Sequence, residues 1–419
     1  MRFVLALTSF LLVSPASAIV TLGASSQNFK LTGIGANAQG QGRSLMAWGS
    51  CAYDGTNTTC TFSGPFTGLG KGGTYNFIVT YPGNGTFPLN AVTNPGSDQF
   101  FAEATGPLSF VITLVENGGP TTHFYSFANF NFLYSSPTCT GTLSSCGVGQ
   151  VGVTPGATIT GAIVGSFDPR PFISPSGVIS AGSYGAFPSI APGTWVEVFG
   201  VNLATTLSQT WAGSDFVGTE APSALGGTTV TIAGKPAYVD FVSPGQVNVQ
   251  APTGIPNGPQ PMVVTTYGGS STAYTVNVNT TQPGLLAPPQ FILGGRQNLV
   301  ALFSNTLTYV LPVNVAGVVT ARARPGDSLT LYGIGFGPVT PDIPAGQVVQ
   351  PQNALQNTLR ITIGGVTANV IYAGLAPGFV GLYQFNVTVP NVPASDATPV
   401  AFTLGGVPGT QTLFIAIGN

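Results

Sequence analysis

The chain has 419 residues, of which only 5% are charged, and its formal net charge is −2. Its 10 lysines and arginines are scattered along the chain, so no basic stripe exists that would neutralise nucleic-acid phosphates or attract an anionic membrane. A hydrophobic content of 43% with 58 glycines and 35 prolines predicts a packed, turn-rich chain, long enough for about two to four domains.

The first 18 residues are typical of a secretory signal. Arg2 precedes an apolar run over residues 3–13, and small residues at 16–18 form a cleavage site, so we expect the mature chain to begin at Ile19. The run is shorter than the roughly 20 residues that a membrane-spanning helix needs, and no later stretch replaces it. The sequence therefore predicts a secreted or cell-surface protein, cleaved near Ala18, without a transmembrane segment.

Four cysteines follow the signal, at Cys51, Cys60, Cys139 and Cys146. An even number of cysteines in an oxidising compartment predicts disulfides, although several pairings are possible. We favour Cys51 with Cys60 and Cys139 with Cys146 because each pair brackets a turn sequence, and each bond would contribute roughly 2–3 kcal/mol. The spacings do not match those of zinc sites and His123 is the single histidine, so disulfides are favoured over a metal.

Residues 19–167 alternate short aromatic and β-branched runs with clusters of Gly, Asn and Pro, and no window has a helical period. We therefore expect an N-terminal β-sandwich domain of about seven or eight strands. The expected strands are 44–52, 58–62, 74–81, 99–102, 108–115, 122–134 and 157–167. Residues 168–177, DPRPFISPSG, are rich in proline and are predicted to form a semi-rigid linker.

The rest of the chain contains a duplicated unit. PGTWVEVFG at 192–200 is matched by PGDSLTLYG at 325–333, and each is followed by V/I-T-I, Pro-Gly and Q-x-N-V blocks in the same order. Period-two alternation predicts that the matched apolar residues point inward; they are Val196, Val198, Leu329 and Leu331. Roughly seven short strands per unit of about 100 residues predict two immunoglobulin-like β-sandwich domains, 178–282 and 283–419, in an all-β chain.

These repeats resemble a known family. The runs APGTWVEVFGVNL, GGTTVTIAGKPAYVDFVSPGQVNVQAP and, in the second copy, RPGDSLTLYGIGFG, ITIGGVTANV and YQFNVTVP are similar to IPT/TIG immunoglobulin-like domains. From about residue 178 onward the chain also resembles an uncharacterised C-terminal module of exported acidobacterial proteins. The resemblance implies tandem TIG-like folds, which occur in receptors, adhesins and non-catalytic parts of polysaccharide enzymes; fold alone does not choose among these.

Groups that could perform catalysis are scarce. His123 lies in an aromatic strand pattern and no G-x-S-x-G motif occurs, so a structural histidine is favoured over a triad base. The Gly-rich run 68–73 precedes a strand pattern, which favours a hairpin turn over an anion site. The 12 acidic residues are not clustered, and Asp54 and Asp327 lack the dense ligand loop of a calcium site, so turn roles are favoured. We therefore expect no catalytic residue, metal site or cofactor.

Aromatic residues outside the predicted core are the candidates for binding. Trp195 alternates with inward valines, while Trp211 and the insertion from Phe379 to Tyr383 lie in predicted loops. Exposed aromatic rings stack on sugars or anchor protein partners. The favoured alternative is that these rings pack between adjacent modules, because tandem modules bury apolar surface against each other.

The primary hypothesis is an exported, non-catalytic structural or binding protein of adhesion type. Its partner would be a protein or a polysaccharide at the cell surface, and not a nucleic acid. The first alternative is a carbohydrate-binding accessory protein that uses loop aromatics. The second is a hydrolase with its site in the N-terminal domain, for which His123 and Glu103 are the residues to test.

Overall fold

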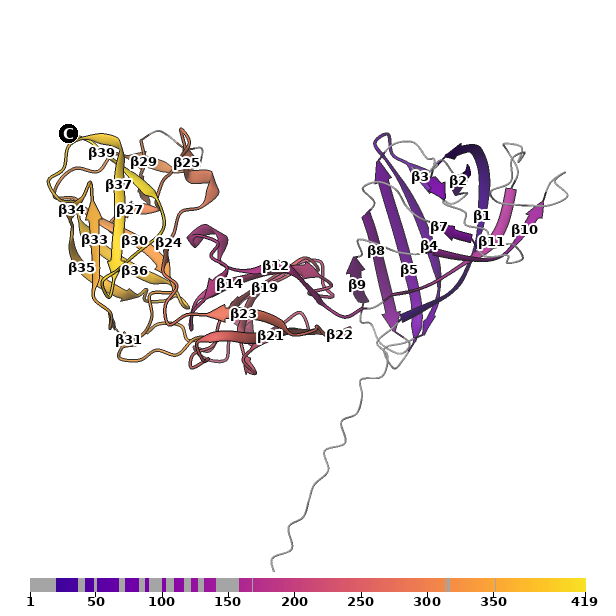
Figure 1. Ribbon diagram of the computed structural model, residues 1–419, viewed down its shortest axis with the longest axis horizontal. Helices are drawn as coiled ribbons and strands as arrows, with labels where there is room; N and C mark the ends of the chain where they lie inside the picture. Colours follow the sequence, from indigo (N-terminus) through magenta and orange to yellow (C-terminus); the bar gives the residue numbers. More distant parts are fainter. Residues whose placement is uncertain are drawn as a thin grey trace, which may run out of the picture. The chain divides into compact units, whose positions relative to one another are not determined.

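The computed structural model divides the chain into two compact units, Met1–Arg170 and Pro171–Asn419 (Figure 1). It describes residues 20–36, 42–48, 51–67, 72–82, 87–89, 100–102, 109–116, 122–126, 132–140, 158–167, 169–312, 315, 317–350 and 352–419. Among these residues the regular elements are strands and three short 3-10 turns. The all-β class that the sequence predicts is therefore confirmed.

The strands of the N-terminal unit belong to one hydrogen-bonded sheet. They are β1 (Val20–Ala36), β2 (Gly42–Trp48), β3 (Cys51–Tyr53), β4 (Asn57–Thr67), β5 (Gly73–Pro82), β6 (Phe87–Leu89), β7 (Phe100–Ala102), β8 (Ser109–Glu116), β9 (Thr122–Ser126), β10 (Phe132–Thr140) and β11 (Thr158–Phe167). The main path runs β7-β10-β11-β1-β4-β5-β8-β9, and β2, β3 and β6 branch from it. The sheet is therefore forked, not a simple ribbon.

The fork lies at β1, drawn in dark indigo in Figure 1. One edge of β1 pairs with β11, while its other edge pairs with β4 at Thr21 and Leu22 and with β2 from Phe29 to Ala36. Register shifts after Leu22 and after Leu31 mark irregularities in this pairing. Strands that belong to both layers of a sandwich bend at such irregularities. β1 therefore connects the branch of the sheet that contains β4 with the branch that contains β2.

Most of the expected strands of this unit are present. The strands expected at 58–62, 74–81, 108–115 and 157–167 correspond to β4, β5, β8 and β11, and the strand expected at 122–134 overlaps both β9 and β10. No expected strand covers β1, whose sequence VTLGASSQNFKLTGIGA contains three glycines, two serines and one asparagine. Such a sequence has weak strand propensity, and pairing on both edges overrides it.

Residues 171–282, called module 1, form a sandwich of two sheets. Their orders are β12-β14-β20-β19-β15 and β13-β23-β21-β17-β16, the second with β18 and β22 paired at its side. The elements are β12 (Phe172–Ser180), η1 (Gly182–Tyr184), β13 (Ser189–Ile190), β14 (Trp195–Val201), β15 (Gln209–Thr210), η2 (Gly213–Asp215), β16 (Ala224–Leu225), β17 (Thr228–Ile232), β18 (Lys235–Pro236), β19 (Tyr238–Val242), β20 (Gln246–Gln250), β21 (Gly258–Thr266), β22 (Gly269–Ser270) and β23 (Tyr274–Val278). Val196 and Val198 are fully buried between the sheets, as their alternation predicts.

The structure differs from the predicted linker at 168–177. From Phe172 onward this segment is β12, an edge strand that pairs with β14 and places Ile173 and Val178 in the core of module 1. Pro175 falls in the register shift between Ile173 and Val178, where no ladder hydrogen bond is needed. Proline is tolerated at edge strands and bulges, so proline content alone misidentified a strand as a linker.

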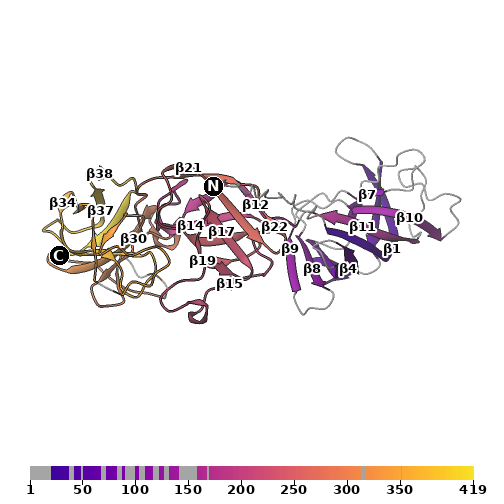
Figure 2. The ribbon, with the colours of Figure 1, turned by 90° about the horizontal axis from the view of Figure 1, so that it is seen from below.

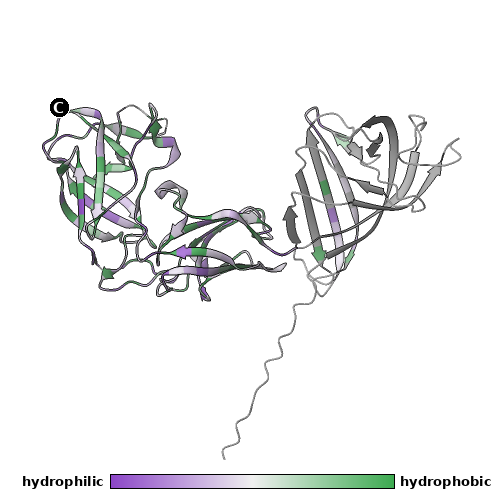
Figure 3. Cartoon of the chain, viewed as in Figure 1, coloured by the Kyte–Doolittle hydropathy of each residue, from purple (hydrophilic) through white to green (hydrophobic). Residues whose placement is uncertain are grey.

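Residues 283–419, called module 2, repeat this architecture. One sheet has the order β29-β28-β27-β30-β36-β35 with β24 beside β30; the other has the order β34-β33-β37-β38 with β39 beside β37 (Figures 1 and 2). The elements are β24 (Gly284–Leu285), η3 (Pro289–Phe291), β25 (Ile292–Leu293), β26 (Arg296–Gln297), β27 (Ala301–Phe303), β28 (Thr308–Val310), β29 (Val319–Ala321), β30 (Ser328–Ile334), β31 (Val339–Thr340), β32 (Ala354–Leu355), β33 (Leu359–Ile363), β34 (Val366–Thr367), β35 (Asn369–Leu375), β36 (Tyr383–Thr388), β37 (Ser395–Leu404), β38 (Val407–Pro408) and β39 (Leu413–Ile417). Hydrophobic and polar residues alternate along its strands in Figure 3, and Leu329 and Leu331 are buried as predicted.

The duplication extends to the hydrogen-bond register. Strand β14 pairs with β20 as β30 pairs with β36, and each partner then pairs with a third strand, β19 or β35. The register shift falls at the same place in both copies, after Val239 and after Val370. The predicted hairpins begin as expected, but their second strand leaves the sheet after two residues, β18 or β34, and continues as β19 or β35 in the opposite sheet.

Candidate functional site: the joint between the modules

Module 1 and module 2 are joined by backbone hydrogen bonds. The Ala221 N–H donates to the Gly346 carbonyl over 2.7 Å, and the Val348 N–H donates to the Thr219 carbonyl over 2.8 Å. On its other side, Val348 forms a β-bridge with Val380 of module 2. Residues 219–221 of module 1 therefore pair with residues 346–348 of module 2, which in turn bridge to Val380. The two modules share secondary structure at this joint.

Trp195 lies at this joint. It begins β14, on the outer side of a strand whose inward residues are the buried valines, and its ring is partly buried. Its Nε1–H donates to the Val380 carbonyl of module 2 over 3.0 Å. Trp211 packs edge-on against it with ring centroids 5.5 Å apart, and Phe216 packs on Trp211 at 4.9 Å. These rings form a continuous aromatic cluster beside the joint.

Gln250 fixes the position of the two modules through its side-chain amide. It ends β20, directly opposite Trp195, and only 2% of the residue is exposed. Its Oε1 accepts from the Gly346 N–H of module 2 over 2.7 Å, while its Nε2 donates to the Gly193 carbonyl of module 1 over 3.0 Å. A buried amide with both ends bonded is costly to disturb, because either partner left alone is buried and unsatisfied.

Two glycines of module 2 allow this close approach. A Cβ atom on Gly381, whose φ is +65°, would lie 2.2 Å from Nε2 of Gln250 and 3.1 Å from Nε1 of Trp195. A Cβ atom on Gly346, whose φ is +82°, would lie 2.2 Å from the ring of Tyr238 in module 1. Both positions have a positive φ, which residues with a side chain rarely adopt, and both leave no room for a Cβ atom. Glycine therefore fits both positions.

The chain segment that connects the two modules is also hydrogen-bonded to them. The Gln282 N–H donates to the Gly335 carbonyl over 3.0 Å, and its side-chain Oε1 accepts from the Ser189 hydroxyl over 2.5 Å. Further along, the Ala287 N–H of module 2 donates to the Ser183 carbonyl of module 1 over 2.7 Å. The connection therefore runs as a bonded segment along both modules and not as a free linker.

The remaining predicted binding residues lie in different surroundings. Phe379 is 53% exposed in the loop that follows β35. Tyr383 begins β36 and is 5% exposed; its hydroxyl donates to the Gly337 carbonyl, and burial raises the pKa of its phenol. The inserted segment thus combines one exposed ring and one core ring. Trp195 contacts module 2, which is the packing between adjacent modules that the sequence favoured over an exposed binding ring.

A cavity of about 390 Å³ opens beside the joint and is lined by both modules. Its neutral polar lining includes Gln250, Asn257, Thr280 and Gln347, and Asp342 adds one carboxylate. No basic side chain is found among the described residues that line it. The volume lies in the range of roughly 300–1,000 Å³ that is usual for small-molecule sites. Neutral amides and hydroxyls suit a hydroxyl-bearing ligand better than an anion.

Two carboxylates lie near the aromatic cluster, on β14 and β19, the two strands that flank β20 in module 1. Glu197 Oε1 accepts from the Gly182 N–H over 3.1 Å. Asp240 occupies the bulge of β19, and its Oδ1 is buried without a hydrogen-bond partner in the described part of the chain. Burial raises the pKa of Asp240 to about 6, its own backbone N–H opposes this effect, and the charge of Glu197 adds to it.

Acidic residues elsewhere have structural roles. Asp54 Oδ1 accepts from the N–H groups of Thr56 and Asn57, and these bonds lower its pKa. Asp327 accepts from the Arg324 N–H, so both residues serve the turns that the sequence indicates. In the described part of the chain no group of three His, Cys, Asp or Glu side chains could hold a metal ion, and no helix there is long and apolar enough to cross a membrane.

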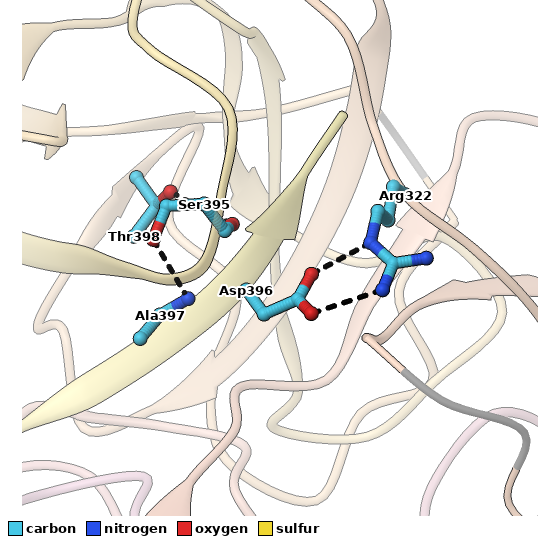
Figure 4. Close-up of polar contacts among 5 residues, drawn as sticks. All are labelled: Arg322, Ser395, Asp396, Ala397 and Thr398. Atoms are coloured by element: carbon cyan, nitrogen blue, oxygen red, sulfur yellow. Dashed lines mark hydrogen bonds and ion pairs between the residues drawn. The ribbon is translucent and has the colours of Figure 1, made fainter. Parts of the chain in front are cut away.

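Arg322 and Asp396 form a two-pronged ion pair on module 2 (Figure 4). Arg322 Nε and Nη2 donate to the two carboxylate oxygens over 2.6 and 2.9 Å, which raises the pKa of Arg322 and lowers that of Asp396. About half of each side chain is exposed to solvent. The pair ties the segment after β29 to the start of β37, and its exposure marks it as a minor structural contact, not a reactive site.

Gln250, Gly346 and Gly381 are site residues that sequence reasoning missed. A signal was present in the repeat comparison: Trp195 pairs across the strands with Gln250, and the equivalent pair in module 2 is Ser328 with Thr388. The copies therefore differ at both members of one cross-strand pair. Only long-range contacts reveal what the difference does, because the partners of that pair are about 100 to 185 residues away along the chain.

No family model and no curated protein matches the chain. Among solved structures, a gamma-CGTase from Alkalophilic bacillus clarkii is similar at 11% identity with a TM-score of 0.19, over 86% of this chain and 40% of that one. Domains 5–6 of the S-layer protein SbsC are similar at 12% identity with a TM-score of 0.20, over 60% of this chain and 100% of that one. The I9–I11 tandem of titin is similar at 8% identity with a TM-score of 0.14, over 86% and 94%. These scores assign neither a family nor an activity to the chain.

Proposed function

We propose that the chain is an exported, non-catalytic structural or binding protein of adhesion type, in which the two immunoglobulin-like modules act as one rigid body. The observation that carries this proposal is the joint, where module 1 adds backbone hydrogen bonds to a ribbon of module 2 and Gln250 bonds both modules. A rigid joint suits a protein that holds a binding surface in a fixed orientation or at a fixed distance. The shared register of the repeats is the reason to retain the TIG-like relationship as part of the proposal.

Rigid docking is tested by asking whether the modules unfold together. Trp195 and Trp211 are both in module 1, and Trp48→Phe removes the tryptophan of the N-terminal unit. In that background Phe385→Ala, which creates a cavity in the core of module 2, should lower stability by about 3–5 kcal/mol. If the modules are coupled, the unfolding transition of module 1, followed by tryptophan fluorescence, should be destabilised by a similar free energy. A tryptophan transition that stays in place while circular dichroism shows a separate earlier step contradicts the rigid joint.

A binding role is tested on the full chain with an array of glycans and extracellular proteins, together with a panel of polysaccharide and peptide substrates. Specific binding without turnover supports the proposal. Turnover that is lost in His123→Ala or Glu103→Ala would establish the hydrolase alternative instead. The side chain of His123 and all of Glu103 lie outside the described residues.

Carbohydrate binding is the second candidate, and the cavity at the joint favours it. Its lining of neutral amides and hydroxyls with one carboxylate matches the hydrogen-bonding needs of a sugar. Trp195 is engaged in the joint, so the cavity replaces the loop aromatics as the proposed contact surface. Glycan binding that is lost in Asn257→Ala and Asp342→Ala but kept in Trp211→Ala supports this candidate, and an array without any signal removes it.

Secretion and disulfides belong to the same proposal. In the β3–β4 hairpin, Cys51 is the register partner of Cys60. Directly opposed residues in an antiparallel pair have Cα atoms about 4.5–5.5 Å apart, within the range that a disulfide spans. Cys139 lies on β10 opposite Ile159, and Cys146 lies outside the described residues. Non-reducing peptide mapping of the secreted protein should find Cys51 linked to Cys60; free thiols at both positions would contradict the pairing.

A further inference from the structure

A second hollow lies on module 1 beside the cavity at the joint. It has a volume of about 540 Å³, and its polar lining consists of Ser189, Asn257, Asn277, Asn279 and Thr280. Asn257 and Thr280 line the cavity as well, and the Asn257 Nδ2 donates to the Thr280 hydroxyl over 2.8 Å. The cavity and this hollow, called the groove, therefore meet at that pair of side chains.

The polar face of the groove follows from alternation along β23. Buried valines alternate there with exposed residues, so Asn277 lies on the outer face of the strand. Asn279 follows the strand, and its Nδ2 donates to the Ser189 hydroxyl over 3.1 Å and to Gln282 Oε1 over 3.0 Å. One asparagine of the groove is thus fixed in place by its neighbours. The other is exposed, and its amide offers two donors and an acceptor to a ligand.

Module 2 fills the equivalent place differently. Ile190 pairs in parallel with the last residue of β23, as Ala323 pairs in parallel with the last residue of β39. Ser189 in the groove therefore corresponds to Arg322, which forms the two-pronged ion pair with Asp396 (Figure 4). Module 2 thus has a charged pair where module 1 has uncharged hydroxyls and amides. The shared fold does not require the polar set of the groove, which points to a role in binding.

The lining of the cavity and the groove selects the class of ligand. Among the described residues no lysine or arginine lines either hollow, and Asp342 of the cavity would repel an anion. Lys235 comes near the rim, but its ammonium donates to the carbonyls of Thr253 and Gly254. Both edges of β23 are paired, with β13 and β21, so a peptide cannot add a strand there. Neutral amides and hydroxyls suit a neutral ligand that is rich in hydroxyl groups.

We propose that the cavity and the groove form one elongated site for a chain of neutral sugars, with one end of the chain in the cavity and the following units in the groove. This proposal rests on carbohydrate binding, the second candidate function, and adds the length and the charge of the ligand. Asp342 lines only the cavity and Asn277 lines only the groove, so the two side chains contact different units of the same chain. Each hydrogen bond replaces one to water and contributes little alone, so affinity depends on filling both hollows.

The test is titration calorimetry of the full chain with malto-, cello- and xylo-oligosaccharides of increasing length, and with oligogalacturonates as the acidic probe. We expect the affinity for at least one neutral series to rise with chain length and then level off, with weaker binding of the acidic series. Asn277→Ala should weaken binding of the longest members about five- to tenfold and leave the shortest member that binds unchanged. Asn391→Ala, at an exposed asparagine of module 2 that lines neither hollow, is the matched control and should change neither.

Three results would overturn the elongated site while leaving carbohydrate binding in the cavity intact. They are an affinity that does not depend on chain length, equal effects of Asn277→Ala and Asn391→Ala, and acidic chains that bind as tightly as neutral ones. If no neutral series binds, carbohydrate binding is rejected together with the site, whereas the rigid joint is decided separately by the unfolding test. Amide exchange of the unmodified chain, saturated with its longest ligand, should slow in residues 253–260 and 274–280. Protection found only elsewhere rejects the site even when a variant folds poorly.

Discussion

The sharpest prediction concerns Asp240→Asn, which removes an ionisable group from the bulge of β19. Asp240 has a buried Oδ1 without a partner in the described part of the chain, and burial raises its pKa from 3.8 to about 6. Asparagine has nearly the same shape and stays neutral at every pH. The substitution therefore separates the cost of the charge from the packing of the side chain.

The sign follows from proton linkage. The folded state binds the Asp240 proton more tightly than the unfolded state, so the contribution of Asp240 to stability is greatest below pH 4 and is lost as the pH rises through about 6. At 1.36 kcal/mol for each pH unit of that interval, the loss is about 3 kcal/mol by pH 7. This value is an upper bound, because solvent reaches part of the side chain. Asp240→Asn should thus stabilise the protein by about 1–3 kcal/mol at pH 7 and by nothing at pH 4.

The measurement is urea unfolding of both proteins in the Trp48→Phe background at pH 4, 5, 6 and 7, followed by the fluorescence of Trp195 and Trp211. Trp211 adjoins Asp240, since its backbone N–H donates to the Asp240 carbonyl. Asp342→Asn, at an exposed carboxylate of module 2, is the matched control for the same substitution on the surface. A gain that is equal at pH 4 and pH 7 would show that packing, not charge, is responsible. A loss of stability at pH 7 would refute the reasoning, because it would mean that the ionised form is favoured by contacts in the folded state.

The other predictions concern the joint and the ion pair. Gln250→Ala removes two buried hydrogen bonds and should lower the free energy of unfolding by about 1–3 kcal/mol, while Gln246→Ala, on the same strand, serves as its control in thermal unfolding. Gly381→Ala brings a Cβ atom within 2.2 Å of Gln250, so it should cost at least as much and increase protease cleavage between the modules; equal cleavage of wild type and variant would contradict this. Arg322→Ala should lower thermal stability only slightly, with the difference vanishing in high salt, because the pair is exposed; a large loss that persists in salt would show that the pair also holds β29 in place.

The sequence determined the local part of this fold. Alternation in PGTWVEVFG and PGDSLTLYG was enough to place Val196, Val198, Leu329 and Leu331 in the cores, because side-chain direction in a strand follows from position along the chain. Matching blocks in the same order were enough to establish two similar modules. These features depend on neighbours in sequence, which a single sequence displays directly.

What only the tertiary structure decided is how distant segments pair. β1 is a strand because both of its edges are paired, and DPRPFISPSG leads into an edge strand because Ile173 and Val178 find a core. Trp195 binds Val380 and Gln250 binds Gly346, partners that no local pattern connects. Pairing energy between remote strands is not encoded in local propensity, so the joint had to come from the assembled fold.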